Sequence, residues 1–213
     1  MLEFQHSYRR HLPHIQPPGA MLFVTFRLSG SLPAHTQAEL LAEANRVKRE
    51  LARLNDSQEQ ARLAYLAHKR LFGRWDDCLD SMTEGPHWLS IPKVAQIVVD
   101  SLHHFDGERY LLDCFCLMSN HTHLVFQPLE KEPGVYYALS SILHSLKRHT
   151  AVSANKILGR QGQFWQHESY DHTVRDEAEL QRIWHYVLNN PVKAGLVDSL
   201  DKWPWSYSRW SIL

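Results

Sequence analysis

The sequence predicts an α+β fold, in which an antiparallel sheet carries packed helices. Runs rich in β-branched and aromatic residues alternate along the chain with segments whose apolar residues recur at three- and four-residue steps. Two of the strand-like runs, 109–118 and 121–127, are separated by only two residues, and a connection that short pairs neighbouring strands antiparallel. With 213 residues, 44% of them hydrophobic, the chain can form one generous domain or a core domain with an insertion.

The first half of the chain begins with a strand and continues with helices. We expect the strand over 21–29, because MLFVTFRLS is rich in β-branched and aromatic residues. From about 36 to 72 the apolar residues follow a helical period, and Asn55-Asp56-Ser57 interrupts this pattern. We expect 73–92, which contains two glycines and two prolines, to be irregular.

The second half alternates helices and strands in the same way. The predicted order is a helix over 92–105, strands over 109–118 and 121–127, a helix over 136–158, an extended segment over 164–174 and a helix over 176–190. The last helix opens on Asp176-x-x-Glu179, which resembles a capping box, and we expect Pro191 to end it.

The composition of the chain limits the classes of function that are consistent with the sequence. The formal net charge is zero, so a nucleic-acid site would depend on local basic patches. Three cysteines without a signal peptide argue against a disulfide scaffold, and we expect Cys114 and Cys116 on one face of a buried strand. There is no apolar stretch long enough to span a bilayer, so we expect a cytoplasmic protein with no membrane partner.

The first chemical feature is the histidine pair of MSNHTHLVFQP. Side chains two residues apart point to the same side of a strand, so His121 and His123 can hold one divalent ion together. Taken alone, the triplet is weak evidence, since 15 histidines in the chain make a chance His-x-His expected. Two ordinary histidines remain the alternative.

The second feature is a tyrosine in the last predicted helix. Asn190 follows Tyr186 by four residues, so both side chains lie on one face of that helix. Such a tyrosine could present its hydroxyl to a cleft, or it could be an amphipathic residue at the edge of the core.

Together the motifs resemble one family. MSNHTHLVFQP, the long helix followed by GRQGQFWQ, and the segment YDHTVRDEAELQRIWHYVLNNPVKAGLV occur in the order of the Y1 transposases. The likeness is to their REP-associated tyrosine transposase branch, within the HUH nuclease superfamily, and it covers about 20–210. The resemblance implies a palm-type, ferredoxin-like domain over 1–213, with a helical insertion at about 36–92.

The resemblance also implies a chemistry. His121 and His123 would bind Mg²⁺ or Mn²⁺, with Asn190 as a further ligand, and Tyr186 would attack single-stranded or hairpin DNA to form a 5′-phosphotyrosine. The family usually has a bulky apolar residue where this chain has Thr122.

Basic and aromatic side chains complete the predicted DNA site. Six basic side chains are candidates for phosphate contacts: Arg27, Lys147, Arg148, Arg160, Arg175 and Lys193. Phe164 and Trp165 could stack on unpaired bases. The alternative for each is an ordinary surface or core role.

Three functions stay open at this point. The chain could be an active nicking and joining enzyme, acting as a monomer or a homodimer. It could instead be a catalytically quiet protein that binds DNA hairpins, although it keeps His121, His123 and Tyr186. An unrelated metal hydrolase would use the histidine pair and leave the tyrosine unexplained.

Overall fold

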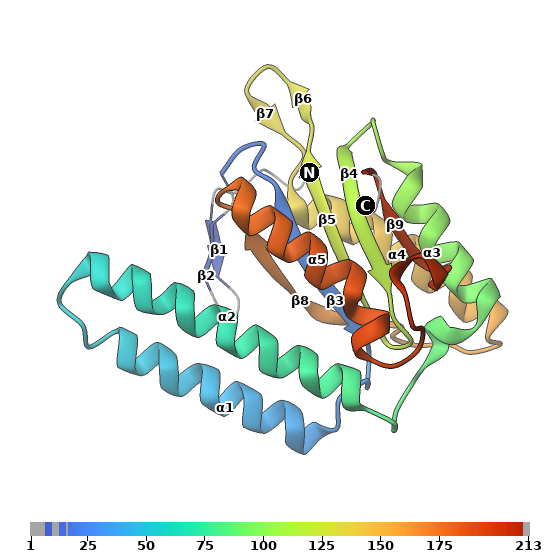
Figure 1. The fold of residues 1–213 in the computed structure, drawn as a ribbon, viewed down its shortest axis with the longest axis horizontal. Helices are drawn as coiled ribbons and strands as arrows, with labels where there is room; N and C mark the ends of the chain where they lie inside the picture. The colour runs from blue at the N-terminus through green and yellow to red at the C-terminus, as the bar shows by residue number, and fades with distance from the viewer. Residues whose placement is uncertain (1–6, 10–12, 16, 211–213) are drawn as a thin grey trace. The chain divides into compact units, whose positions relative to one another are not determined.

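The chain forms two compact units. The computed structural model describes residues 7–9, 13–15 and 17–210. One unit is Gly30–Pro86, and the other combines the described segments before and after it (Figure 1). The smaller unit overlaps the predicted helical insertion at about 36–92, and the expectation of one domain over the whole chain stays a prediction.

The larger unit is built on a five-stranded sheet. Its order is β8-β3-β5-β4-β9, and all neighbouring strands are antiparallel. The strands are β3 (Leu22–Leu28), β4 (Tyr110–Leu117), β5 (His121–Pro128), β8 (Trp165–Thr173) and β9 (Ser206–Ser208). Two small two-stranded sheets accompany it, β1 (Ser7–Arg9) with β2 (Pro13–Ile15) and β6 (Glu130–Glu132) with β7 (Val135–Tyr136). The predicted α+β fold and the antiparallel pairing of β4 with β5 are confirmed.

Helices cover both faces of the sheet. They are α3 (Pro92–His104), α4 (Leu139–Ile157) and α5 (Glu177–Lys193), with short 3-10 turns at η1 (Trp88–Ser90) and η2 (Leu200–Lys202). In Figure 1, α5 crosses one face of the sheet, and α3 and α4 lie on the other side. We call these the α5 face and the α3/α4 face.

The hydrophobic core lies between the sheet and helices α3 and α4. Strand β3 contributes its even-numbered residues, Leu22, Val24, Phe26 and Leu28, and β5 contributes Leu124 and Phe126. Successive side chains of a strand point to opposite faces, so Phe23, Thr25 and Arg27 point to the α5 face. The sheet therefore separates the apolar core from the α5 face, where polar and charged side chains such as Thr25 and Arg27 lie.

The smaller unit is a pair of helices. They are α1 (Ala34–Leu51) and α2 (Ser57–Ser81). The predicted break between them is confirmed, because the Asp56 carboxylate accepts two backbone N–H groups at the start of α2. The expectation of an irregular segment from residue 73 is wrong, since α2 runs through Gly73 and buries Leu79 in a small apolar cluster of this unit.

The last helix also runs further than predicted. Pro191 does not end α5, which continues to Lys193. A proline removes one N–H, which the carbonyl of Val187 would have accepted four residues earlier. The next turn still closes, because the Ala194 N–H donates to the Asn190 carbonyl at 2.9 Å. A proline this near the end of a helix thus costs one hydrogen bond without breaking the helix.

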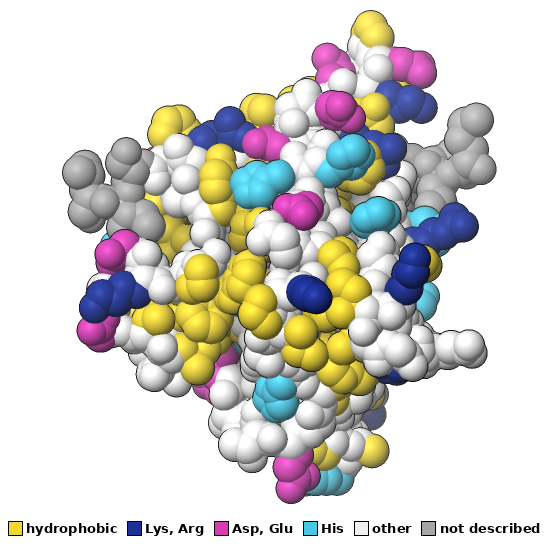
Figure 2. All heavy atoms as spheres, turned by 90° about the vertical axis from the view of Figure 1, so that its right-hand side faces the viewer, with side chains coloured by type: hydrophobic (Ala, Val, Ile, Leu, Met, Phe, Trp, Pro, Cys, Tyr) yellow, Lys and Arg dark blue, Asp and Glu magenta, His cyan; other side chains and the backbone are white. Residues whose placement is uncertain are grey.

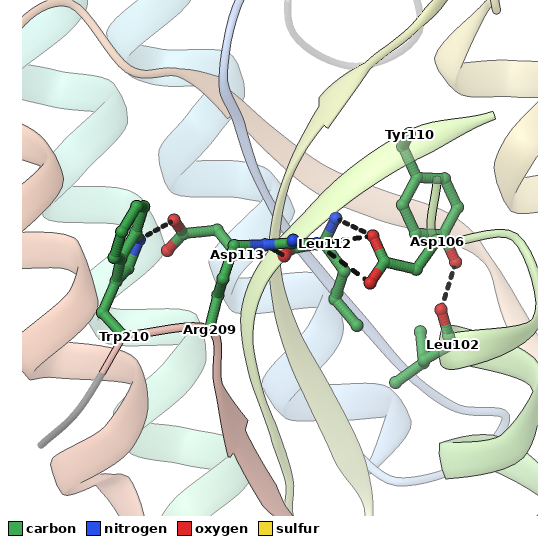
Figure 3. A network of polar contacts seen from close by, with 7 residues as sticks. All are labelled: Leu102, Asp106, Tyr110, Leu112, Asp113, Arg209 and Trp210. Carbon is green, nitrogen blue, oxygen red and sulfur yellow. Dashed lines mark hydrogen bonds and ion pairs between the residues drawn. The ribbon is translucent and has the colours of Figure 1, made fainter. Parts of the chain in front are cut away.

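The chain after α5 is tied to the edge of the sheet (Figure 3). The Arg209 guanidinium donates to both carboxylate oxygens of Asp106, at 2.7 and 2.9 Å, and to the Leu112 carbonyl at 2.6 Å. The Trp210 indole N–H donates to the Asp113 carboxylate at 3.0 Å. These contacts hold β9 beside β4.

The predicted burial of the two cysteines of β4 is confirmed. Cys114 and Cys116 are fully buried free thiols. Burial raises the pKa of the Cys114 thiol, which keeps it protonated and unreactive at neutral pH.

No helix in the described part of the chain combines the length and the apolar character that crossing a membrane requires.

Candidate active site

Two buried imidazoles form the centre of the α5 face. His121 and His123 lie two residues apart on β5, and their Nε2 atoms are 3.0 Å from each other. Both side chains are at least 99% buried. The prediction that both side chains project from the same side of the strand is therefore confirmed.

Helix α5 brings an amide to this pair. The Asn190 Nδ2 group donates to His123 Nε2 at 3.0 Å. Its other amide atom, Oδ1, is buried and has no hydrogen-bond partner among the described residues. A buried acceptor without a donor costs about 1–3 kcal/mol, so this oxygen is available for another positive partner.

The same helix places a tyrosine ring against the histidines. The Tyr186 ring meets His123 edge to face, with ring centroids 5.6 Å apart and planes at 70°. Tyr186 is partly buried and lies one turn before Asn190. One chain therefore supplies both imidazoles, the amide and the phenol, and a second copy is not needed to deliver the tyrosine.

An aromatic side chain of β3 supports the tyrosine and the histidine. Phe23 stacks on His123 with centroids 5.9 Å apart, and it meets Tyr186 edge-on at 6.1 Å. It also meets Tyr170 of β8 at 5.9 Å. Contacts of this kind favour offset and edge-to-face geometry, so Phe23 limits the positions open to both rings.

The electrostatics of the face favour neutral imidazole and an anionic ligand. Burial and, to a smaller extent, the positive charge of Lys193 lower the pKa of His123 to about 3. Arg27 lies opposite His121 in the pairing of β3 with β5 and is also buried. Burial lowers its pKa to about 10, so it remains charged at neutral pH. Two cations thus lie on the same face as the neutral imidazole of His123.

The donor set fits a divalent cation. Two ligand atoms about 2.1 Å from one ion, at right angles, lie about 3.0 Å apart, which matches the separation of the two Nε2 atoms. Asn190 adds an oxygen that has no donor in the described part of the chain. Imidazole nitrogen together with amide oxygen suits Mn²⁺ at least as well as Mg²⁺.

The start of α5 is fixed to β8 by a capping arrangement. The Asp176 carboxylate accepts the Glu179 N–H at 2.7 Å, as the predicted capping box requires. The Glu179 carboxylate accepts the Arg175 N–H at 3.1 Å and lies 3.3 Å from Nε2 of His172 on β8. The helix that carries Tyr186 is therefore anchored at its first turn.

The predicted basic contacts divide between the two faces of the sheet. Arg27 and Lys193 lie beside the histidines, and Arg175 is exposed just before α5. Lys147 and Arg148 belong to α4, on the opposite face. On the surface in Figure 2, lysines and arginines are scattered among acidic, apolar and histidine side chains and do not form one basic patch.

Several predicted DNA contacts have structural roles. Lys147 donates to the carbonyls of residues 166 and 167, and the Arg160 guanidinium lies 4.0 Å from the centre of the Trp88 ring. Phe164 and Trp165 are 1% and 5% exposed in the hydrophobic core, so their rings cannot stack on bases in this conformation. Their place next to basic residues in the sequence suggested a DNA surface, but they pack inward as β8 begins.

Three residues of the site escaped the sequence analysis: Phe23, Thr25 and Asn120. The Thr25 hydroxyl lies 2.8 Å from His123 Nδ1, and Asn120 Oδ1 lies 2.6 Å from His121 Nδ1. Asn120 directly precedes the histidines, and that adjacency was the one available signal. Phe23 and Thr25 come close only through the pairing of distant strands.

Comparison with known proteins finds relatives both in sequence and in structure. No protein-family model matches the chain. A curated protein of Haemophilus influenzae that carries the name of a REP-associated tyrosine transposase is 28% identical over 96 residues, covering 43% of this chain. The matched region spans 54% of that relative, about half of its length.

A solved structure is similar in fold. It is a REP-associated tyrosine transposase bound to a REP hairpin, with a TM-score of 0.51 and 16% identity over 93% of this chain and 80% of that one. The two matches confirm the resemblance to REP-associated tyrosine transposases.

Proposed function

We propose that this chain is a metal-dependent enzyme that nicks and rejoins single-stranded or hairpin DNA through Tyr186. The observation that carries the proposal is the meeting of α5 and β5, where Tyr186 and Asn190 both contact His123. In this proposal His121, His123 and Asn190 hold Mg²⁺ or Mn²⁺.

The residues around the pair suit a phosphodiester. The ion that His121, His123 and Asn190 would hold could withdraw charge from a non-bridging phosphate oxygen, which would make the phosphorus easier to attack. Arg27 and Lys193 add positive charge on the same face, which favours a polyanion even though the chain as a whole is neutral.

The covalent step conserves the ester bond energy. The Tyr186 oxygen forms a bond to the phosphorus as the bond from phosphorus to the 3′-oxygen breaks. The phenol loses its proton and the leaving 3′-oxygen gains one, so protons balance. The product is a 5′-phosphotyrosine and a free 3′-OH, and attack by the 3′-OH of another strand reverses the step and joins the DNA.

The relatives support hairpin DNA as the substrate class. The solved relative is bound to a REP hairpin, and the curated relative carries the name of the same group. Exposed Arg175 and Lys193, at the two ends of α5, are the proposed phosphate contacts beside the site. Replacing Lys193 with alanine should weaken binding and reduce the dependence of log affinity on log salt by about one.

Trapping the covalent adduct tests the proposal. The full chain is incubated with Mn²⁺ and a labelled pool of single-stranded DNA hairpins with randomised flanks, and the products are separated on a denaturing gel. We expect a DNA-protein adduct that disappears in Tyr186→Phe. The matched control is Tyr207→Phe, since Tyr207 packs on His103 at the α3/α4 face and should leave the adduct intact.

The other outcomes select other functions. Hairpin binding with no adduct from any member of the pool contradicts the enzyme and supports a quiet hairpin-binding protein. An adduct that persists in Tyr186→Phe contradicts the assigned nucleophile. Metal-dependent hydrolysis of a small ester without any DNA adduct supports the metal hydrolase.

A further inference from the structure

Each imidazole of the histidine pair is held at its far nitrogen by a different residue. Asn120 Oδ1 lies 2.6 Å from His121 Nδ1, and Thr25 Oγ1 lies 2.8 Å from His123 Nδ1. Asn120 and Thr25 are 1% and 5% exposed, so water does not compete freely for these contacts.

These partners determine which nitrogen carries the proton. An amide oxygen only accepts, so His121 Nδ1 must donate to Asn120 and carry the hydrogen. His123 Nε2 accepts from Asn190, so in the neutral ring the hydrogen of His123 is on Nδ1, where it donates to Thr25. When His121 is also neutral, as metal binding requires, both rings present a lone pair at Nε2.

The two lone pairs face each other across a short distance. The Nε2 atoms are 3.0 Å apart, and with both hydrogens on Nδ1 no proton lies between them. Two lone pairs this close repel each other unless a positive charge is near both. A cation bound by both nitrogens would convert that repulsion into two coordinate bonds, once the Asn190 amide turns so that its oxygen and not its N–H faces the ion.

The backbone holds the two partners in place. Asn120 is in the turn between β4 and β5, where its carbonyl accepts the Leu28 N–H at 2.8 Å. Thr25 pairs directly with His123 across β3 and β5. A β-branched side chain has few rotamers, so the threonine hydroxyl stays directed at the ring.

We propose that Asn120 and Thr25 are positioning residues of the metal centre, which fix both imidazoles in the tautomer that directs Nε2 at the ion. The inference rests on the proposed function, because it assumes that His121 and His123 bind a metal. Hydrogen-bond partners of metal-binding histidines typically contribute about 10- to 100-fold to metal affinity.

Metal affinity measured on paired variants tests the inference. The free Mn²⁺ concentration is followed by electron paramagnetic resonance as the full chain is titrated, which reads binding without DNA or catalysis. Thr25→Val and Asn120→Ala remove the acceptor, and we expect Kd for Mn²⁺ to rise about 10- to 100-fold. Thr25→Ser and Asn120→Asp keep an acceptor oxygen and should bind Mn²⁺ close to wild type.

The outcomes separate this inference from the proposed function. Unchanged affinity in Thr25→Val and Asn120→Ala overturns the positioning role, while the metal site stands if His121→Ala abolishes binding. Absence of Mn²⁺ binding to the wild-type chain overturns the metal centre and this inference together.

A spectroscopic measurement avoids variants that fail to fold. Nitrogen-15 NMR of the metal-free wild-type chain reports which ring nitrogen carries the proton. We expect the Nδ1–H tautomer for both His121 and His123, and an Nε2–H signal from either ring overturns the inference.

Discussion

Strand β5 buries both of its faces equally, but with opposite chemistry. On the α3/α4 face, Leu124 and Phe126 are fully buried among apolar side chains. On the α5 face, His121 and His123 are just as buried, and their nitrogens contact Thr25, Asn120 and Asn190. Buried polar groups stabilise a fold only when they are paired, so the α5 face is organised for binding and the other face for stability.

Thr122 is an exception to this contrast, because it is a polar residue on the apolar face. It is fully buried, and its hydroxyl has no hydrogen-bond partner within the described part of the chain. It occupies the position where the resembling family usually has a bulky apolar residue. The buried, unpaired hydroxyl thus lowers the stability of the fold.

The largest effect should come from opening the apolar face. Phe126→Ala leaves a cavity between β5 and the helices, and we expect the free energy of unfolding to fall by about 3–5 kcal/mol. Urea denaturation measures it. Val152→Ala on α4 is the control, because Val152 is 67% exposed and its truncation should change stability by no more than about 0.5 kcal/mol. Equal losses in the two variants contradict the assignment of the core.

Metal should stabilise the wild-type chain through the α5 face. Mn²⁺ at about one hundred times its Kd should add about 2.7 kcal/mol to the free energy of unfolding, and a chelator should reverse this. The double variant His121→Ala/His123→Ala should gain nothing. Thr122→Val, between the two histidines but on the other face, should keep the full gain. Stabilisation that survives the double variant would place the ion elsewhere.

Replacing threonine with valine should change the free energy of unfolding in opposite directions on the two faces. Thr25→Val leaves the Nδ1–H of His123 without its acceptor, and we expect a loss of about 1–3 kcal/mol. Thr122→Val removes an unpaired buried hydroxyl and should stabilise by about 1 kcal/mol. Thermal denaturation of both variants without metal gives the comparison, and losses of similar size in both would contradict it.

A last effect concerns pH. Burial lowers the pKa of His123 from 6.5 to about 3, so between these values the unfolded chain binds a proton that the folded chain does not. The stability that the neutral ring contributes is complete above pH 6.5, and it is lost as the pH falls toward 3, by up to about 1.4 kcal/mol per pH unit.

A variant isolates this contribution from that of other groups. The stability of the metal-free wild type minus that of His123→Gln should decrease as the pH is lowered through this range. Urea titrations at several pH values measure the difference, and a difference that does not change with pH contradicts the buried neutral ring.

Local patterns were enough to predict the four longer strands of the five-stranded sheet and which candidate side chains lie together. The two-residue connection gave the β4–β5 hairpin, and alternation along a strand placed His121 and His123 together. Four-residue spacing on a helix placed Tyr186 with Asn190. Each of these inferences needs only neighbours in the sequence.

What the sequence analysis missed depends on contacts between distant segments. Thr25 and His123 are 98 positions apart, and only the register of β3 against β5 brings them together. Phe164 and Trp165 follow basic residues, yet tertiary packing buries them. Pro191 departs from the local rule that proline ends helices, because its place in the final turn limits the cost to one hydrogen bond.

Locating the covalent bond tests the central claim most directly. Hairpin DNA carrying a separate label on each side of the cleavage position is incubated with the chain and Mn²⁺, and the adduct is digested and mapped by mass spectrometry. The account predicts that Tyr186 carries the fragment with the 5′-phosphate and that the other fragment leaves with a free 3′-OH. A bond to any other residue, or to the 3′ end of the released fragment, would contradict it.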